Sequence, residues 1–155
     1  MNIRRTLYLL AALAVVAITG CEETPSDPGN EAIMAEWKAT RIGEAFSPAS
    51  ELELHFESGG NLHGKLGTMD ITGTYSTSGS SATSSIRQIT LDMTLPLDVT
   101  LVGIYQVDGN KLTLEVVPDN ANDDITPPDA AAGFGSTKDN GTAAGNRYMS
   151  NFDKM

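Results

Sequence analysis

The sequence is poor in the residues on which most catalytic and metal-binding sites depend. It contains one cysteine and two histidines among 155 residues. A single thiol allows no disulfide within the chain, and two histidines leave little material for a catalytic triad. No serine stands in the G-x-S-x-G pattern of a nucleophile elbow. We therefore expect a protein that is not an enzyme and needs no cofactor, with a hydrolase that uses carboxylates as the less favoured alternative.

Positive charge is also scarce. Ten Lys and Arg residues stand against twenty Asp and Glu, which gives a formal net charge of −10. Nucleic-acid binding depends on basic side chains that neutralise phosphates, and the sequence has no basic patch. We expect no nucleic-acid partner. The same acidity disfavours direct adhesion to anionic lipid.

Only one long apolar run is present, from Leu7 to Ile18, and it follows the basic pair Arg4 and Arg5. A helix that spans a bilayer needs about 20 apolar residues, so this run is too short to cross comfortably. A short apolar run behind positive charges is typical of a secretory signal. We predict a signal peptide over residues 1–20.

The run ends in Ile18-Thr19-Gly20-Cys21, which resembles the lipobox of bacterial lipoproteins. The resemblance implies cleavage before Cys21 and acylation of its thiol, which would anchor the protein to a membrane. Glu22 is not the aspartate that commonly retains lipoproteins in an inner membrane. We expect a lipid-anchored protein of the bacterial cell envelope, on the periplasmic or outer-membrane side. An ordinary secretory signal or an uncleaved anchor are the alternatives.

Cleavage would leave one acidic domain behind a spacer. Residues 21–31 are rich in Pro, Gly and acidic side chains, which favours a spacer without a core. The remaining residues, 32–155, are enough for one domain with a modest core. At its start, Ile33 and Trp37 fit one helical turn, whereas Trp37, Ala39 and Arg41 fit the start of a strand. The sequence does not decide between the two.

From Glu51 onward the apolar residues repeat with period two, which predicts strands. Leu52, Leu54 and Phe56 alternate with charged residues, and a Ser-Gly-Gly-Asn turn leads into a returning strand. The next alternation runs over 69–76. We predict a flexible loop over 77–85.

A longer alternation over 89–101 is interrupted by Pro96, which predicts two strands or a bent edge strand. Asp108-Gly109-Asn110 predicts a hairpin. Residues 119–146 are expected to form a flexible loop, and 146–152 a last strand with Tyr148 and Phe152. We predict an all-β fold, a small antiparallel barrel of about eight strands that closes to protect its edges.

Several segments together resemble the lipocalin-like domains of bacterial lipoproteins. They are Trp37, the Leu52–Gly64 hairpin, Arg87–Met93 and Gly103–Leu114. The second half is similar to an uncharacterised lipocalin-like domain of planctomycetes, although Ala35 and Thr126 depart from its pattern. The resemblance implies a barrel and no known activity.

Such a domain would bind a small apolar ligand inside the barrel or present its rim loops to another envelope protein. In a third version the barrel is filled and serves as a scaffold without a ligand. The candidates for the barrel interior are Trp37, Leu54, Phe56, Tyr75, Leu91, Met93 and Tyr105.

The two histidines, His55 and His63, are predicted to face each other across the first hairpin, with Glu53 opposite Lys65. Two imidazoles near Glu57 or Glu53 are weak candidates for a zinc or copper site. Exposed polar pairs are common in hairpins, and we therefore predict no metal centre. The acidic stretch 119–124 does not have the spacing of an EF-hand, which excludes a calcium loop of that type.

Overall fold

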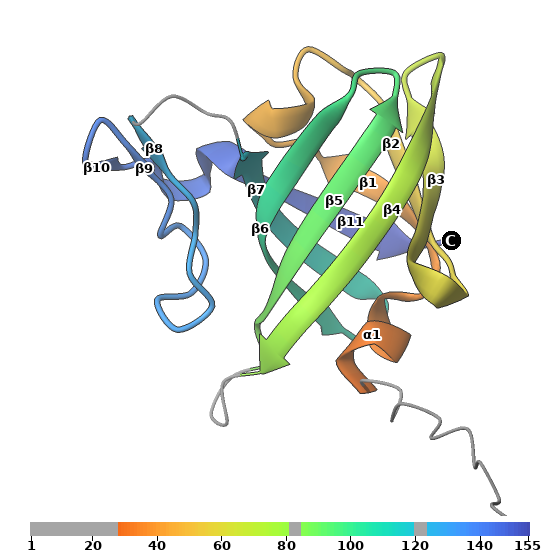
Figure 1. Ribbon diagram of the computed structural model, residues 1–155, viewed down its shortest axis with the longest axis horizontal. Coiled ribbons are helices and arrows are strands. Elements are labelled where there is room, and N and C mark those ends of the chain that lie inside the picture. The colour runs from red at the N-terminus through yellow and green to blue at the C-terminus, as the bar shows by residue number, and fades with distance from the viewer. Residues whose placement is uncertain (1–27, 81–84, 120–123) are drawn as a thin grey trace, which may run out of the picture.

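The structure, a computed structural model, is a closed barrel of eight antiparallel strands, as the sequence predicted (Figure 1). It describes residues 28–80, 85–119 and 124–155. The predicted signal peptide, Cys21 and most of the predicted spacer lie outside these ranges. The barrel strands are β1 (Glu36–Arg41), β2 (Leu52–Phe56), β3 (Asn61–Leu66), β4 (Met69–Ser80), β5 (Arg87–Leu95), β6 (Val99–Asp108), β7 (Lys111–Pro118) and β11 (Met149–Lys154).

Each strand from β1 to β6 pairs with the next along the chain, and β11 pairs with both β7 and β1. Strand β11 thus joins the two ends of the sheet. Trp37 lies opposite Lys154, and Ala39 lies opposite Phe152. This seam leaves no unpaired strand edge in the barrel, which protects it from edge-to-edge aggregation.

The period-two pattern sets which side chains point inward. In β2, Leu52, Leu54 and Phe56 are buried, whereas the intervening Glu53 and His55 are partly exposed. The predicted hairpin register is confirmed, because His55 pairs with His63 and Glu53 pairs with Lys65. The chain also breaks at Pro96 as predicted, with β5 before it and β6 after it.

The prediction of a flexible loop over 77–85 is wrong for its first part, because β4 continues to Ser80. Thr77 pairs with Ile89, and the register shifts between Ser78 and Ser80. Gly79 has a φ of 61° within this irregularity, a conformation that glycine adopts without strain. Because this segment has no large apolar residues, its sequence does not show the alternation of a strand, although it pairs with β5 up to Ser80 across the bulge. Residues 81–84 lie outside the described ranges.

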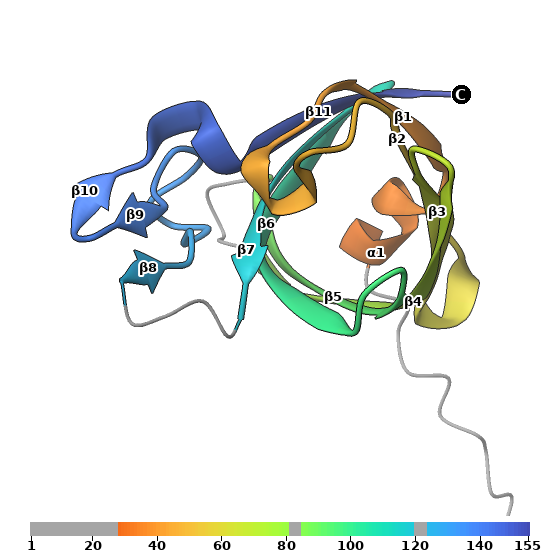
Figure 2. The ribbon, with the colours of Figure 1, turned by 90° about the horizontal axis from the view of Figure 1, so that it is seen from above.

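The predicted loop over 119–146 contains a small sheet of three short strands. They are β8 (Ile125–Thr126), β9 (Lys138–Asp139) and β10 (Thr142–Ala143), in the order β10-β9-β8. A 3-10 helix, η3 (Gly145–Tyr148), then leads into β11. We call residues 124–148 the excursion. It lies outside the barrel, beside β6 and β7 (Figures 1 and 2).

Both ends of the barrel are closed by short helices. Helix α1 (Pro28–Ile33), which begins inside the predicted spacer, enters one end, as the view down the barrel in Figure 2 shows. The indole N–H of Trp37 donates a hydrogen bond of 2.8 Å to the carbonyl of Ile33. Helix η1 (Glu44–Phe46) brings Phe46 to the other end, which we call the upper rim. Of the two sequence alternatives, the strand start at Trp37 is realised in β1. The helical turn through Ile33 and Trp37 is not, because α1 ends at Ile33.

Inward glycines allow neighbouring strands to approach closely where the sheet curves. At Gly103 on β6, an added Cβ would lie 1.9 Å from the carbonyl oxygen of Glu115 on β7. At Gly73 on β4, it would lie 2.1 Å from the carbonyl oxygen of Asp92 on β5. No side chain fits in either gap. Such glycine positions permit the strong coiling that a small barrel needs.

None of the helices in the described ranges is both long and apolar enough to span a membrane.

Candidate functional site

The barrel interior is filled by its own side chains. The seven residues predicted to line it are all buried in one cluster, with exposed fractions of 0–5%. They are Trp37, Leu54, Phe56, Tyr75, Leu91, Met93 and Tyr105. A chamber large enough for a ligand would leave accessible area on the side chains around it. These residues therefore serve as a packed core in this structure.

The ends of the core are sealed in the same way. Ile33 of α1 and Phe46 of η1 belong to the cluster and are 0% and 2% exposed.

Two aromatic side chains of the core are in direct contact: Phe56 and Tyr75 pack edge to face with their ring centroids 5.0 Å apart. The Tyr75 hydroxyl donates a 2.9 Å hydrogen bond to the carbonyl of Glu57. Burial raises the pKa of this phenol, with a smaller contribution from Tyr105.

A second buried layer lies on the outer wall of the barrel, beneath the excursion. Ile104 on β6 and Val117 on β7 alternate with inward residues and so face outward, yet both are fully buried. Tyr148 of η3 is also buried but does not belong to the interior core. The excursion thus covers an apolar strip of the outer wall.

Glu115 on β7 bonds the excursion to the outer wall of the barrel. Its side chain faces outward and is fully buried. One carboxylate oxygen accepts a hydrogen bond of 2.6 Å from the backbone N–H of Gly135. The other accepts bonds from the backbone N–H and the hydroxyl of Thr137. A buried carboxylate is tolerated when such donors replace its water.

Arg147 ties the end of the excursion to the upper rim. Its guanidinium pairs with both carboxylate oxygens of Glu44 in η1 and with Asp139 in β9. These partners, Glu44 first, raise the pKa of Arg147. A further bond runs from the Arg41 guanidinium to the Asn146 carbonyl, at 2.6 Å. The excursion is therefore anchored at two separate points.

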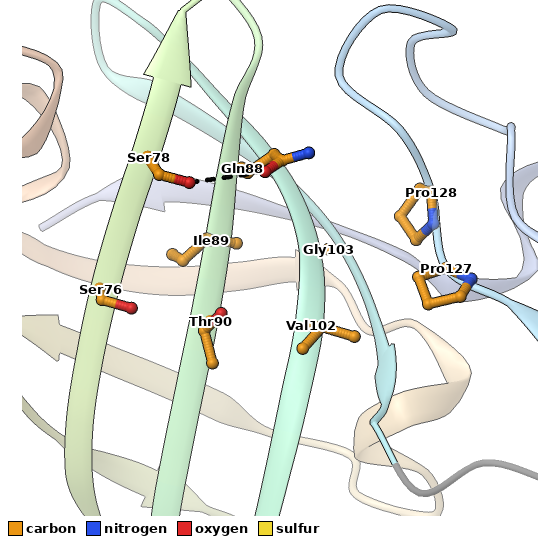
Figure 3. A pocket seen from close by; sticks show the side chains of 9 residues that line it. All are labelled: Ser76, Ser78, Gln88, Ile89, Thr90, Val102, Gly103, Pro127 and Pro128. Carbon is orange, nitrogen blue, oxygen red and sulfur yellow. Dashed lines mark hydrogen bonds between the residues drawn. The ribbon is translucent and has the colours of Figure 1, made fainter.

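A groove of about 230 Å³ opens between the outer wall and the excursion (Figure 3). Ser76, Ser78, Gln88 and Thr90 line the wall side, and Pro127 and Pro128 face them from the excursion. No charged side chain is among its lining residues in the described ranges. Hydroxyl and amide groups of this kind suit an uncharged polar ligand better than an ion.

The upper rim carries exposed apolar side chains. Met69, Leu95 and Leu97 have exposed fractions of 50%, 51% and 70%. They lie at the turns that join β3 to β4 and β5 to β6, at the end of the barrel opposite α1 (Figure 1). A pocket of about 270 Å³ beside Met69 is lined mainly by Phe46, Leu66 and the chain between Pro48 and Ser50.

The predicted histidine pair lies on the outer wall, across β2 and β3. His55 and His63 are 40% and 51% exposed, and Glu57 lies within 4 Å of both imidazoles. In the described ranges, no group of three or more His, Cys, Asp or Glu side chains could hold a metal ion. The acidic stretch 119–124 falls largely outside these ranges.

Sequence reasoning did not identify Glu115 or the strip that it helps to cover. The signal was present in Leu112–Pro118, where Glu115 and Val117 take outward positions. An apolar residue at an outward position indicates a covered wall, and a lone carboxylate beside it indicates a buried polar contact. The upper rim gave no such signal, because Leu95 and Leu97 continue the inward positions of the alternation on either side of Pro96 and yet are exposed.

Comparisons with known proteins do not extend these observations, because no family model, curated protein or solved structure matches the chain.

Proposed function

We propose that the protein is a lipid-anchored, non-catalytic module of the bacterial cell envelope whose filled barrel presents the upper rim to another protein. The packed interior supports a scaffold over a carrier of small apolar ligands, since the candidate lining residues are occupied with one another. Recognition then falls to the outer surface. The exposure of Leu97 in particular supports the rim as the recognition surface, because apolar side chains gathered at a surface favour protein contacts.

The proposed lipid anchor and the upper rim would lie at opposite ends of the domain. The chain enters the described domain at α1, and the rim lies at the opposite end of the barrel (Figure 1). A domain anchored through Cys21 would therefore turn its rim away from the membrane. Exposed Glu51 and Asp98 lie at this same end. We infer a partner with an apolar patch bordered by basic residues, because like charges disfavour a second copy of this acidic chain.

The tether is tested by fractionation of cells that express Cys21→Ala. Wild-type protein is expected with the membranes, and the variant with the soluble fraction. Ser47→Ala, with its change far from the signal, serves as the control and is expected to stay with the membranes. A Cys21→Ala variant that remains membrane-bound would contradict the lipid anchor and leave the rim proposal to be tested alone.

The rim is tested in living cells with a photo-crosslinking residue placed at Leu97. The control carries the same residue at Lys111, the first residue of β7, at the end of the barrel opposite the upper rim. We expect one discrete adduct from position 97 and none from 111. The adduct should disappear when Leu95→Asp is introduced, and the captured protein should carry a basic contact surface. Equal labelling from both positions, or none from position 97, would contradict recognition through the rim.

A further inference from the structure

The groove between the outer wall and the excursion contains two rows of uncharged polar side chains (Figure 3). Ser76 on β4 lies directly opposite Thr90 on β5. Two residues further along β4, Ser78 lies directly opposite Gln88. Because side chains alternate between the faces of a strand and Tyr75 is buried in the core, these four face outward. Neighbouring strands are about 4.8 Å apart and successive outward residues about 6.6 Å apart, so the four form a small grid of polar groups.

Most groups of this grid have no partner within the described part of the protein. The hydroxyls of Ser76 and Thr90 bond to no residue in those ranges. The Ser78 hydroxyl reaches the side-chain oxygen of Gln88 only at 3.5 Å, which is the limit of a hydrogen bond. The Gln88 amide nitrogen donates to no described residue. The grid therefore offers hydroxyl donors and acceptors and an amide donor to a ligand.

Apolar atoms line the other side of the groove. Val102 on β6 lies directly opposite Thr90 and is half-buried. Pro127 and Pro128 face the wall from the excursion (Figure 3). A proline ring presents C–H groups, and its nitrogen carries no donor. A ligand held in the groove would meet polar groups on one side and apolar surface on the other.

The groove is neutral although the chain is strongly acidic. The formal net charge is −10, yet no charged side chain is among the lining residues in the described ranges. An anion would be repelled by the surrounding chain and would find no cation here to offset that repulsion. A cation would find no carboxylate with which to pair. The groove therefore favours a neutral ligand with several hydroxyl groups.

We propose that the groove binds a neutral saccharide. A pyranose ring has hydroxyls around its edge and apolar C–H groups on its faces. The edge would bond to Ser76, Thr90 and Gln88, while a face packs against Val102 or the two prolines. The volume of about 230 Å³ lies below the roughly 300–1,000 Å³ of pockets for drug-sized ligands, which suits one sugar unit. The site is separate from the upper rim and does not depend on the partner proposed there.

The test is an NMR titration of the full chain in a detergent without a sugar headgroup. The neutral probes are maltotriose, cellotriose and chitotriose, and trigalacturonic acid is the anionic counterpart. We expect at least one neutral probe to bind with a millimolar or lower dissociation constant. It should shift the side-chain amide of Gln88 and the backbone amides of Ser76 and Thr90. Trigalacturonic acid should leave them unchanged.

Thr90→Val removes one hydroxyl of the grid and keeps the shape of the side chain. Binding should weaken about fivefold, which is the usual effect of losing one neutral hydrogen bond. Thr74→Val is the matched control, because it makes the same change on the outer face of β4 outside the groove lining. It should bind like the wild type. Both changes lie on the outer face and should leave the barrel folded, which circular dichroism checks.

Glu115→Ala tests whether the ligand lies between the wall and the excursion. Glu115 does not line the groove, but its loss removes bonds that hold the excursion to the wall. The affinity for the saccharide should therefore fall. Unchanged affinity in this variant would overturn a ligand held between the two parts.

Three results of the titrations would overturn the saccharide site itself. They are no shift with any neutral probe at millimolar concentration, equal binding of trigalacturonic acid, and equal affinities in Thr90→Val and Thr74→Val. A sedimentation assay with insoluble envelope glycan then identifies the source of the sugar. Retention of the wild type and loss in Thr90→Val would support a polymer, whereas probe binding without retention would support a free oligosaccharide.

Discussion

The carboxylate of Glu115 accepts hydrogen bonds from both the backbone N–H and the hydroxyl of Thr137, 22 residues further along the chain. Both residues are fully buried. This pairing fastens the excursion to the outer wall of the barrel. The barrel thus has two buried layers, an apolar interior and a thinner outer layer with a charged group at its centre.

Glu115→Ala is expected to loosen the excursion while the barrel stays folded. The change removes the acceptor for the N–H groups of Gly135 and Thr137 and should lower the free energy of unfolding by about 2–4 kcal/mol. Urea denaturation measures this loss, and hydrogen exchange at the two amides locates it. Glu51→Gln, at an exposed glutamate, is the control. Unchanged exchange at Gly135 and Thr137 would show that the carboxylate does not hold the excursion.

Gly103→Ala is expected to prevent normal barrel closure. The new methyl group would meet the backbone of β7, which cannot move aside, so a loss above about 4 kcal/mol is expected. Gly109→Ala is the comparison, since Gly109 has a φ of 58° and open space around it, and should cost about 1 kcal/mol. Cooperative melting followed by circular dichroism distinguishes them. Equal losses for the two variants would refute the role of close strand approach.

Ile33→Ala is expected to destabilise the closed end of the barrel. The side chain of Ile33 is fully buried in the core, and its truncation should cost about 2–4 kcal/mol. Met34→Ala, next to it and only partly buried, should cost less than about 1 kcal/mol. Urea midpoints compare the two. If both variants unfold at the wild-type midpoint, α1 is not a part of the core.

Alkaline pH is expected to destabilise the fold through Tyr75. Burial raises the pKa of its phenol above the ordinary value of 10.0, so the folded chain keeps a proton that the unfolded chain releases. The stabilisation is complete below pH 10 and disappears as the pH rises through the folded-state pKa. Urea midpoints between pH 8 and pH 12 follow this loss.

Tyr75→Phe supplies the comparison for this pH dependence. It should start from a lower stability, by about 1 kcal/mol, because the bond to the Glu57 carbonyl is lost. Its stability should then fall less steeply above pH 10 than that of the wild type. Some fall remains, since burial also raises the pKa of Tyr148. Identical slopes in the two proteins would contradict the assignment to Tyr75.

The barrel itself was predictable because its strands have one wet face and one dry face. Alternation over residues 51–117 fixed which side chains point inward and, together with the turn at Asp108–Asn110, the register of the hairpins. The break at Pro96 was predictable because proline cannot donate to a ladder. These are local signals, and each acts within a few residues.

The parts that sequence reasoning missed depend on contacts between distant segments. The excursion has little apolar content, and its place on the wall is set by Glu115 and Arg147, whose partners lie far along the chain. Strand β4 was cut short for a related reason, since Thr77 and Ser78 show no alternation and are held by β5. The sequence also did not decide whether the barrel interior is filled by side chains or holds a ligand. Alternation shows which residues point inward but not how much space they leave.

The seam between β1 and β11 also has a consequence for how the polypeptide matures. The first barrel strand finds one of its two partners only at the far end of the domain, where Trp37 meets Lys154 and the Met155 N–H bonds to the Glu36 carbonyl. A nascent chain that emerges amino end first must hold β1 half-paired until β11 appears. The appearance of β11 is therefore the step that commits the chain to its final shape, and variants that lack β11 should accumulate as open, adhesive sheets.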